Sequence, residues 1–257
     1  MDAAKDRVRD QYQRSGDGYR ESVIHAKGKD LEWIAEEIGP SSPPLLALDI
    51  ATGAGHTAFV LSRVCRRVVG LDITPRMLEI AAEEADRRGL DNITWFEGDA
   101  ENLPLPDRLF DLVTSRIAPH HFPHPEQAFA EARRVLVPGG RLILVDNIVP
   151  DDSATDRILN EVETLRDPSH QRVFPIVGWT RLLEAAGFST VAHVRSWETP
   201  VQWREWMDRA RTPTPSREQA WKLLQTAPES VQQKLGFDPT ADDPTLILRK
   251  SMWICRK

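Results

Sequence analysis

The stretch Leu45-Leu-Ala-Leu-Asp-Ile-Ala-Thr-Gly-Ala-Gly-His-Thr-Ala58 decides the fold of this chain. Residues 45–50 form an apolar run, which is typical of a strand buried on both faces of a parallel sheet. Two glycines follow, and residues 57–64 have the spacing of an amphipathic helix. A glycine-rich turn in this position leaves backbone N–H groups exposed and lets a ligand come close. The stretch therefore predicts a nucleotide-type site or, as an alternative, a connecting loop that merely needs glycines.

Apolar strands and helical segments alternate through the chain beyond this turn. Further strands are expected at 67–72, 92–97, 110–114, 141–146, 188–194 and 245–255, and helices at 74–88, 125–136, 153–166 and 178–186. Such alternation predicts an α/β fold with a right-handed, mostly parallel sheet and helices on both faces. Ligands of such sheets bind at the carboxyl ends of the strands.

We expect a single domain over residues 1–257, with a core of about 30–199 completed by a last strand within 244–257. Residues 2–14 and 29–38 are predicted to be helical, and residues 12–19, which contain two glycines, a loop or hinge. The N-terminal segment 1–29 and the helical insertion 200–240 are expected to form a lid over the site. Both segments should then resist proteolysis when the cofactor binds.

Composition restricts the possible partners. The net charge is −6, from 33 basic and 39 acidic side chains, which argues against a nucleic-acid partner. No apolar run reaches the length of a membrane span, and the first residues lack the apolar core of a signal peptide. Cys65 and Cys255 are too few for a disulfide framework. We therefore expect a cytoplasmic protein without membrane insertion, acting on a small molecule; the sequence leaves the oligomeric state open.

The glycine turn by itself also fits the Gly-x-Gly-x-x-Ala pattern of dinucleotide-binding enzymes. Asp72, at the end of the second strand, suits either reading because a carboxylate there accepts both hydroxyls of a ribose. Asp49 precedes the turn, where it would be awkward beside a pyrophosphate but would brace the turn around a ligand with a cationic head. Asp99 and the backbone of Ala100 follow the third strand, where they could read an adenine edge. A polar and aromatic loop begins at Arg116, at the same rim.

The ordered set of motifs resembles the class I S-adenosylmethionine-dependent methyltransferases, in the group similar to the ubiquinone/menaquinone-biosynthesis methyltransferases. The matching stretches are Asp49–Gly55, Asp72-Ile73, Gly98–Leu105, Phe110–Val113 and Arg134–Leu142. The resemblance covers roughly residues 40 to 150. It implies a Rossmann-like, seven-stranded sheet whose last strand is antiparallel, S-adenosyl-L-methionine as cofactor and S-adenosyl-L-homocysteine as product.

The resemblance also implies roles for individual residues in the cofactor site. Gly53 and Gly55 approach the methionine part, Asp72 holds the ribose, and Ile73 packs on the adenine whose amino edge Asp99 and Ala100 read. To these we add the remaining expected cofactor-binding residues, which are Asp49, Ala51, Met77, Arg116, Tyr19 and His25.

Two further stretches, residues 19–31 and 165–170, resemble a less characterised branch of the group. They differ from the quinone-pathway enzymes, which argues against a quinone acceptor.

A histidine is the side chain best suited to take a proton from the methyl acceptor near neutral pH. The candidates are His121 and His170, with His120 as a neighbour. Packing of a loop is an equal explanation for these histidines, and we expect no metal because no carboxylate–histidine pattern accompanies them.

The expected function is methyl transfer from S-adenosylmethionine to a small molecule. A nicotinamide-dependent oxidoreductase using the same turn, or a non-catalytic protein that binds an adenosyl ligand, remain alternatives.

Overall fold

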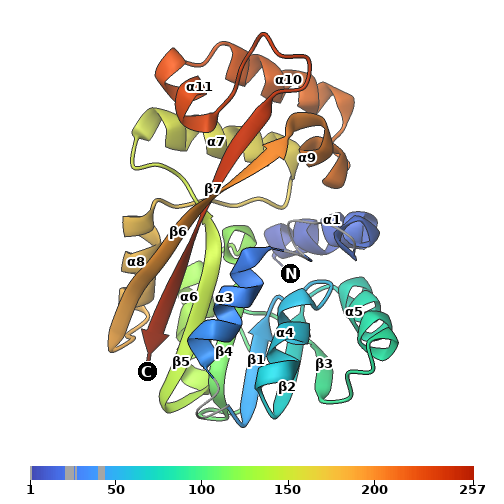
Figure 1. Ribbon diagram of the computed structural model, residues 1–257, viewed down its shortest axis with the longest axis vertical. Helices are drawn as coiled ribbons and strands as arrows, with labels where there is room; N and C mark the ends of the chain where they lie inside the picture. Colours follow the sequence, from blue (N-terminus) through green and yellow to red (C-terminus); the bar gives the residue numbers. More distant parts are fainter. Residues whose placement is uncertain (1, 21–25, 27, 40–43) are drawn as a thin grey trace.

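The apolar runs of the sequence form one sheet with the strand order β3-β2-β1-β4-β5-β7-β6 in this computed structural model, which describes the chain apart from residues 1, 21–25, 27 and 40–43 (Figure 1). The strands are β1 (Leu46–Ile50), β2 (Arg67–Asp72), β3 (Ile93–Glu97), β4 (Phe110–Arg116), β5 (Leu136–Ile148), β6 (Thr190–Gln202) and β7 (Thr245–Arg256). β1 to β5 pair in parallel, whereas β7 is antiparallel to both β5 and β6. The Rossmann-like sheet with an antiparallel last strand is thereby confirmed.

Helices cover both faces of this sheet, as the alternation of elements predicted (Figure 1). The helices of the sheet are α3 (Lys29–Ile38), α4 (His56–Val64), α5 (Pro75–Arg87), α6 (Pro125–Val135) and α8 (Ile176–Ala185). One core joins α3 and α4 to the sheet, and another joins α6 and α8 to its other face. In β1, Ala47 belongs to the first core and Leu48 to the second, so the strand is buried on both sides.

A helical cap lies where β6 ends and β7 begins (Figure 1). It consists of α7 (Ser153–Arg166), α9 (Trp203–Arg209), α10 (Thr214–Gln225) and α11 (Glu229–Leu235). The cap has its own apolar core, in which Trp203 and Trp206 are buried. β6 was expected to end at residue 194, but it continues to Gln202. The reason is that β7 pairs with it as far as Thr245, and Val201 packs into the cap core.

The predicted loop at residues 12–19 is wrong, because one continuous helix, α1 (Ala3–Arg20), runs through it. Gly16 explains the error: a Cβ there would lie 2.9 Å from Sδ of Met77 and 3.2 Å from Cδ1 of Ile80. The glycine is needed for α1 to lie close against α5, and not for a turn. Gln11 also donates a hydrogen bond of 2.8 Å to the carbonyl of Ala210, which ties α1 to the cap.

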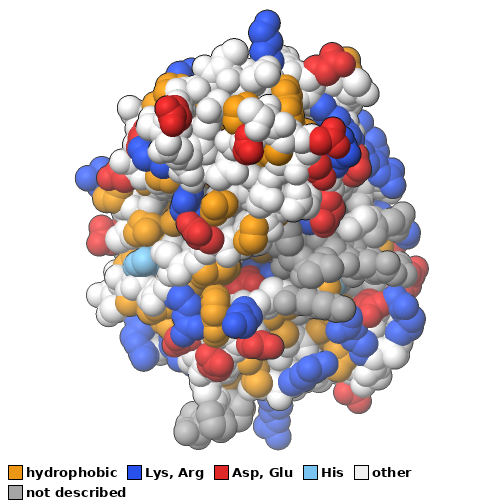
Figure 2. All heavy atoms as spheres, turned by 45° about the horizontal axis from the view of Figure 1, so that its top comes forward, with side chains coloured by type: hydrophobic (Ala, Val, Ile, Leu, Met, Phe, Trp, Pro, Cys, Tyr) orange, Lys and Arg blue, Asp and Glu red, His pale blue; other side chains and the backbone are white. Residues whose placement is uncertain are grey.

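Among the described residues, no helix has the length and apolarity needed to cross a membrane. On the face shown in Figure 2, basic and acidic side chains are interspersed, so the described residues there form no continuous basic stripe.

Candidate active site

A cavity of about 980 Å³, measured out to its open mouth, lies at the carboxyl ends of β1, β2, β3 and β4. This is where ligands of open α/β sheets bind. Four strand ends and one face of α1 form the wall. The lining residues are Lys5, Val8, Tyr12, 51–54, 56–57, 71–73, Met77, 98–101, 116–118 and 121–123.

Asp49 lies behind the glycine turn rather than on the cavity wall. Its carboxylate accepts hydrogen bonds of 2.6 Å from the hydroxyls of both Thr52 and Thr114. Burial raises the pKa of Asp49 to about 6, although these two hydrogen bonds favour the charged form. Asp49 therefore braces the turn through Thr52, which does line the cavity.

The two glycines of the turn have different tasks. Gly53 has a φ of 55° and lines the cavity, where a Cβ would lie 3.5 Å from Cε of Met77. Gly55 has a φ of 86° and precedes α4; a Cβ there would lie 2.7 Å from the ring of Phe59. Only Gly53 thus gives a ligand close access to the backbone, whereas Gly55 lets the turn pack on α4.

Asp72 faces the cavity from the end of β2, with its carboxylate fixed by the backbone. One oxygen accepts the N–H of Gly53 at 2.8 Å and the other accepts the N–H of Thr74 at 2.9 Å. Burial raises the pKa of Asp72, against the effect of these hydrogen bonds. Each carboxylate oxygen keeps a further lone pair for a ligand hydroxyl.

The loop after β3 forms the far end of the cavity, next to Leu71, Ile73 and Met77. Asp99 accepts the N–H of Glu101 at 2.9 Å and pairs with Nζ of Lys5 at 2.7 Å. Lys5 also reaches a carboxylate oxygen of Glu101 at 2.6 Å. These ion pairs hold the start of α1 against the rim of the cavity.

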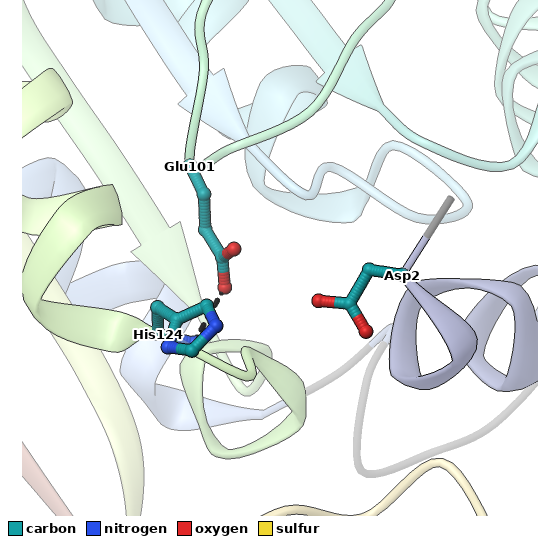
Figure 3. Close-up of side chains that lie close together, drawn as sticks. All are labelled: Asp2, Glu101 and His124. Carbon is teal, nitrogen blue, oxygen red and sulfur yellow. Dashed lines mark hydrogen bonds between the residues drawn. The ribbon is translucent and has the colours of Figure 1, made fainter.

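Only one group of potential metal ligands comes together among the described residues, namely Asp2, Glu101 and His124 (Figure 3). The two carboxylates of the group already have another task. Asp2 accepts the N–H of Ala4 at the start of α1, and Glu101 pairs with Lys5 and accepts the backbone N–H of His124 at 2.6 Å. We assign this group to the docking of α1.

The N-terminal segment was expected to lie over the site, but the side chains of α1 that line the cavity were not predicted from the sequence. Lys5, Val8 and Tyr12, spaced i, i+3 and i+7, present one face of the helix to the cavity. This spacing was the available signal, but the two glycines of residues 12–19 pointed to a loop. Arg116, which was expected at the rim, lines the cavity and donates from Nε to Asp30 at 2.5 Å, with both side chains buried.

His121 is the predicted histidine that reaches the cavity. Its Nε2 lies 2.8 Å from the hydroxyl of Tyr12, and its Nδ1 lies 3.0 Å from the hydroxyl of Ser169. It sits in η1 (Pro119–His121), a single 3-10 turn between β4 and α6. Burial, together with the charge of neighbouring His120, lowers the pKa of His121 to about 4. The imidazole is therefore neutral at pH 7.

His120 and His170 lie behind His121 and outside the cavity lining. Nδ1 of His120 is 2.6 Å from the carboxylate of Asp146. Burial alone would lower the pKa of His120, but the negative charge of Asp146 has the larger effect, so the pKa of His120 is raised. Nε2 of His170 bonds the side-chain oxygen of Asn160 at 3.0 Å. Burial, together with the positive charge of neighbouring histidine and arginine side chains, lowers the pKa of His170 well below its usual value. Neither ring is placed to meet a ligand directly.

The remaining expected site residues lie beyond the described part of the chain or away from the cavity. His25 and the side chain of Tyr19 are outside the described residues. Within the described lining, no residue of 200–240 is present; that segment supports α1 from the cap instead. Of the predicted cofactor residues, the structure brings eight to the cavity wall: Ala51, Gly53, Asp72, Ile73, Met77, Asp99, Ala100 and Arg116.

Comparison with known proteins gives a consistent result. Residues 48–144 match the protein family described as "Methyltransferase domain". The chain is 34% identical over 221 residues to the uncharacterized methyltransferase YcgJ of Bacillus subtilis, which covers 86% of this chain and 87% of that protein.

Two further matches agree. The crystal structure of a putative methyltransferase from Bacillus halodurans aligns with a TM-score of 0.84 and 32% identity, over 90% of this chain and 99% of that one. The demethylmenaquinone methyltransferase of Thermus thermophilus is 37% identical over 155 residues, which are 59% of this chain and 67% of that protein.

Proposed function

The chain belongs to the class I S-adenosylmethionine-dependent methyltransferases, and on this premise we propose that it methylates a small, apolar acceptor whose proton is taken by Tyr12 and His121. Family membership decides against the nicotinamide-dependent oxidoreductase and the non-catalytic binding protein. The hydrogen bond between Tyr12 and His121 at the cavity wall carries the proposal.

The residues of the glycine-turn half of the cavity fit an adenosyl cofactor. The buried carboxylate of Asp72 is held in place to accept ribose hydroxyls, and Leu71, Ile73 and Met77 offer an apolar surface for an adenine. Asp99 lies at the edge of that surface. Gly53 lets the methionine part approach the turn, with the charge of Asp49 behind it.

S-adenosylmethionine supplies a methyl group that is activated by its positive sulfur. When bound, it would give this methyl group to the acceptor's electron pair and would keep the electrons of the broken carbon–sulfur bond on sulfur. The acceptor's proton passes to the oxygen of Tyr12 as the hydroxyl proton of Tyr12 passes to Nε2 of His121. The positive charge of the sulfonium is lost as His121 gains one, so the net charge of the cavity does not change.

A base at this position is useful only to an acceptor that must lose a proton, such as a hydroxyl or an acidic carbon. The wall near His121 is otherwise apolar, with Ile117, Ala118, Phe122 and Pro123. An apolar molecule with a weakly acidic hydroxyl, such as a phenol or enol, therefore fits this end of the cavity. One relative is named for a demethylated quinone, so a short-chain quinol belongs among the acceptors tested.

The experiment is to measure release of S-adenosylhomocysteine with a panel of phenols, enols, short-chain quinols and amines, for the unmodified protein and for His121→Asn. We expect turnover with a hydroxyl acceptor and a loss of about 10²- to 10⁴-fold in His121→Asn, the usual effect of removing a general base. Binding of S-adenosylhomocysteine, measured by calorimetry, should be the same in both proteins. Full turnover in His121→Asn, or turnover with amines alone, would contradict the proposal.

A further inference from the structure

A buried chain of hydrogen bonds connects Asp167 to the cavity. The hydroxyl of Ser169 donates to a carboxylate oxygen of Asp167 at 2.5 Å and lies 3.0 Å from Nδ1 of His121. Nε2 of His121 then meets the hydroxyl of Tyr12 at 2.8 Å. Asp167 and Ser169 are 1% and 0% exposed, so water does not compete for these contacts.

The sequence explains why Ser169 lies where it does. Asp167 ends α7 and, with Pro168, forms a turn in which its carboxylate accepts the N–H of Ser169 at 2.8 Å. The two residues after the turn's His170 donate their N–H groups to the carbonyl of His120, each at 3.0 Å. The turn is thus fixed both to its own aspartate and to the backbone next to His121.

The direction of each hydrogen bond follows from the number of protons available. Burial works against the charged form of Asp167, but the charge of His121 when it is protonated, the charge of Arg166 and two hydrogen bonds from Ser169 outweigh it and keep the pKa of this carboxyl below its usual value. Asp167 is therefore a carboxylate, which only accepts. Ser169 has one hydroxyl proton, and Asp167 takes it, so towards His121 the oxygen of Ser169 can only accept.

It follows that Nδ1 of neutral His121 carries the proton and Nε2 has the lone pair. Nε2 then accepts from the hydroxyl of Tyr12, which lines the cavity. With the opposite tautomer, Nδ1 and the oxygen of Ser169 would face each other as two acceptors, and Nε2–H would have no basic electron pair to offer.

We propose that Asp167 and Ser169 are positioning residues that hold His121 as its Nδ1–H tautomer, with the basic Nε2 directed at Tyr12. This inference rests on the proposed function, since it concerns the base of that reaction. When Nε2 gains the acceptor's proton, Nδ1–H stays bonded to Ser169, and the negative charge of Asp167 faces the new positive charge. No proton needs to leave Ser169.

The tautomer can be tested without knowing the acceptor. Protein labelled with ¹⁵N-histidine and bound to S-adenosylhomocysteine is examined at pH 7 by two-bond ¹H–¹⁵N correlation, with His121→Asn to identify the signals. We expect His121 to carry its proton on Nδ1, and Ser169→Ala to shift it to Nε2. Ser62→Ala, which removes one hydroxyl bonded to the carbonyl of Phe59, is the matched control and should leave the pattern unchanged.

The kinetic consequence is a loss of kcat of about 10-fold or more in Ser169→Ala and in Asp167→Asn, with KM for the acceptor and the affinity for S-adenosylhomocysteine nearly unchanged. A proton on Nε2 in the unmodified protein would overturn the inference, as would an unaltered tautomer in both variants. The first measurement does not need Ser169→Ala, so it decides even if that variant does not fold. Failure of the proposed function would instead appear as full turnover in His121→Asn.

Discussion

The two ends of the cavity are built in different ways. At the cofactor end, the side chains follow directly from neighbouring strands: residues 51–54 after β1, Asp72 at the end of β2 and residues 98–101 after β3. At the acceptor end, Tyr12 comes from α1, His121 from the turn after β4 and Ser169 from the turn after α7. The first end is fixed by backbone geometry within single strand–turn units. The second exists only when three distant segments pack together.

This difference separates binding from chemistry. The cofactor end holds the carboxylate of Asp72 with two backbone N–H groups, which no side-chain substitution elsewhere removes. The acceptor end holds its imidazole with two hydroxyls. Variants of the first end should therefore change cofactor affinity, and variants of the second should change turnover with the cofactor still bound.

The sharpest test of the cofactor end is Asp72→Asn. Loss of a charged acceptor for ligand hydroxyls should weaken binding of S-adenosylhomocysteine about 10- to 100-fold, since hydrogen bonds to charged groups contribute roughly 1.5–3 kcal/mol. Isothermal titration calorimetry gives the affinity, and Asp86→Asn, an exposed change on α5, is the control. Unchanged affinity in Asp72→Asn would place the ribose elsewhere.

A smaller effect distinguishes the two cofactor forms. Asp49→Asn should weaken S-adenosylmethionine about 10-fold while leaving S-adenosylhomocysteine nearly unaffected, because only the former carries a positive sulfur near this carboxylate. Calorimetry of both ligands tests the ratio. Equal losses for both would mean that Asp49 acts through Thr52 alone.

The preference for S-adenosylmethionine over S-adenosylhomocysteine should also depend on pH. The carboxyl of Asp49 has a pKa of about 6, so it gains a proton as the pH falls through that value. The preference for the sulfonium form should therefore decline below pH 6 in the unmodified protein and stay constant in Asp49→Asn. A preference that is independent of pH in both would remove the electrostatic explanation.

The smallest expected effect concerns α1. Adding S-adenosylhomocysteine should slow trypsin cleavage within α1 by a few-fold, because Lys5, Val8 and Tyr12 line the cavity and local opening would expose it. The segment 200–240, which contributes nothing to the described lining, should be cut at an unchanged rate. Lys5→Met, which removes the ion pairs with Asp99 and Glu101, should speed the cleavage of α1. Equal protection of both segments would favour the two-part lid expected from the sequence.

Local patterns were enough to predict most of the fold. The strand at 45–50, the helix at 74–88 and the succession of the remaining strands along the chain all depend on residues adjacent in sequence, and the structure confirms these elements. The errors lie where tertiary contacts override a local signal. Gly16 reads as a turn residue until Met77 and Ile80 are known to pack against it. The length of β6 depends on its partner β7.

The site residues likewise fall into those that local sequence predicts and those that depend on tertiary contacts. Asp72 and Asp99 follow their strands directly, so their place on the cavity wall could be predicted from the sequence. The sequence identified the three histidines as candidates but could not show which of them contacts the ligand. Only packing shows that His121 reaches the cavity while His120 and His170 lie behind it. Tyr12 and Ser169 were not recognised at all, since nothing near them in the sequence points to His121.

The most direct test of the account is a crystal structure of the protein with S-adenosylhomocysteine. We expect the ribose hydroxyls on the carboxylate of Asp72, the adenine against Ile73 and Met77, and the sulfur directed at the space beside Tyr12 and His121. A sulfur facing away from His121, or a ribose that does not contact Asp72, would contradict the division of the cavity into a cofactor end and an acceptor end.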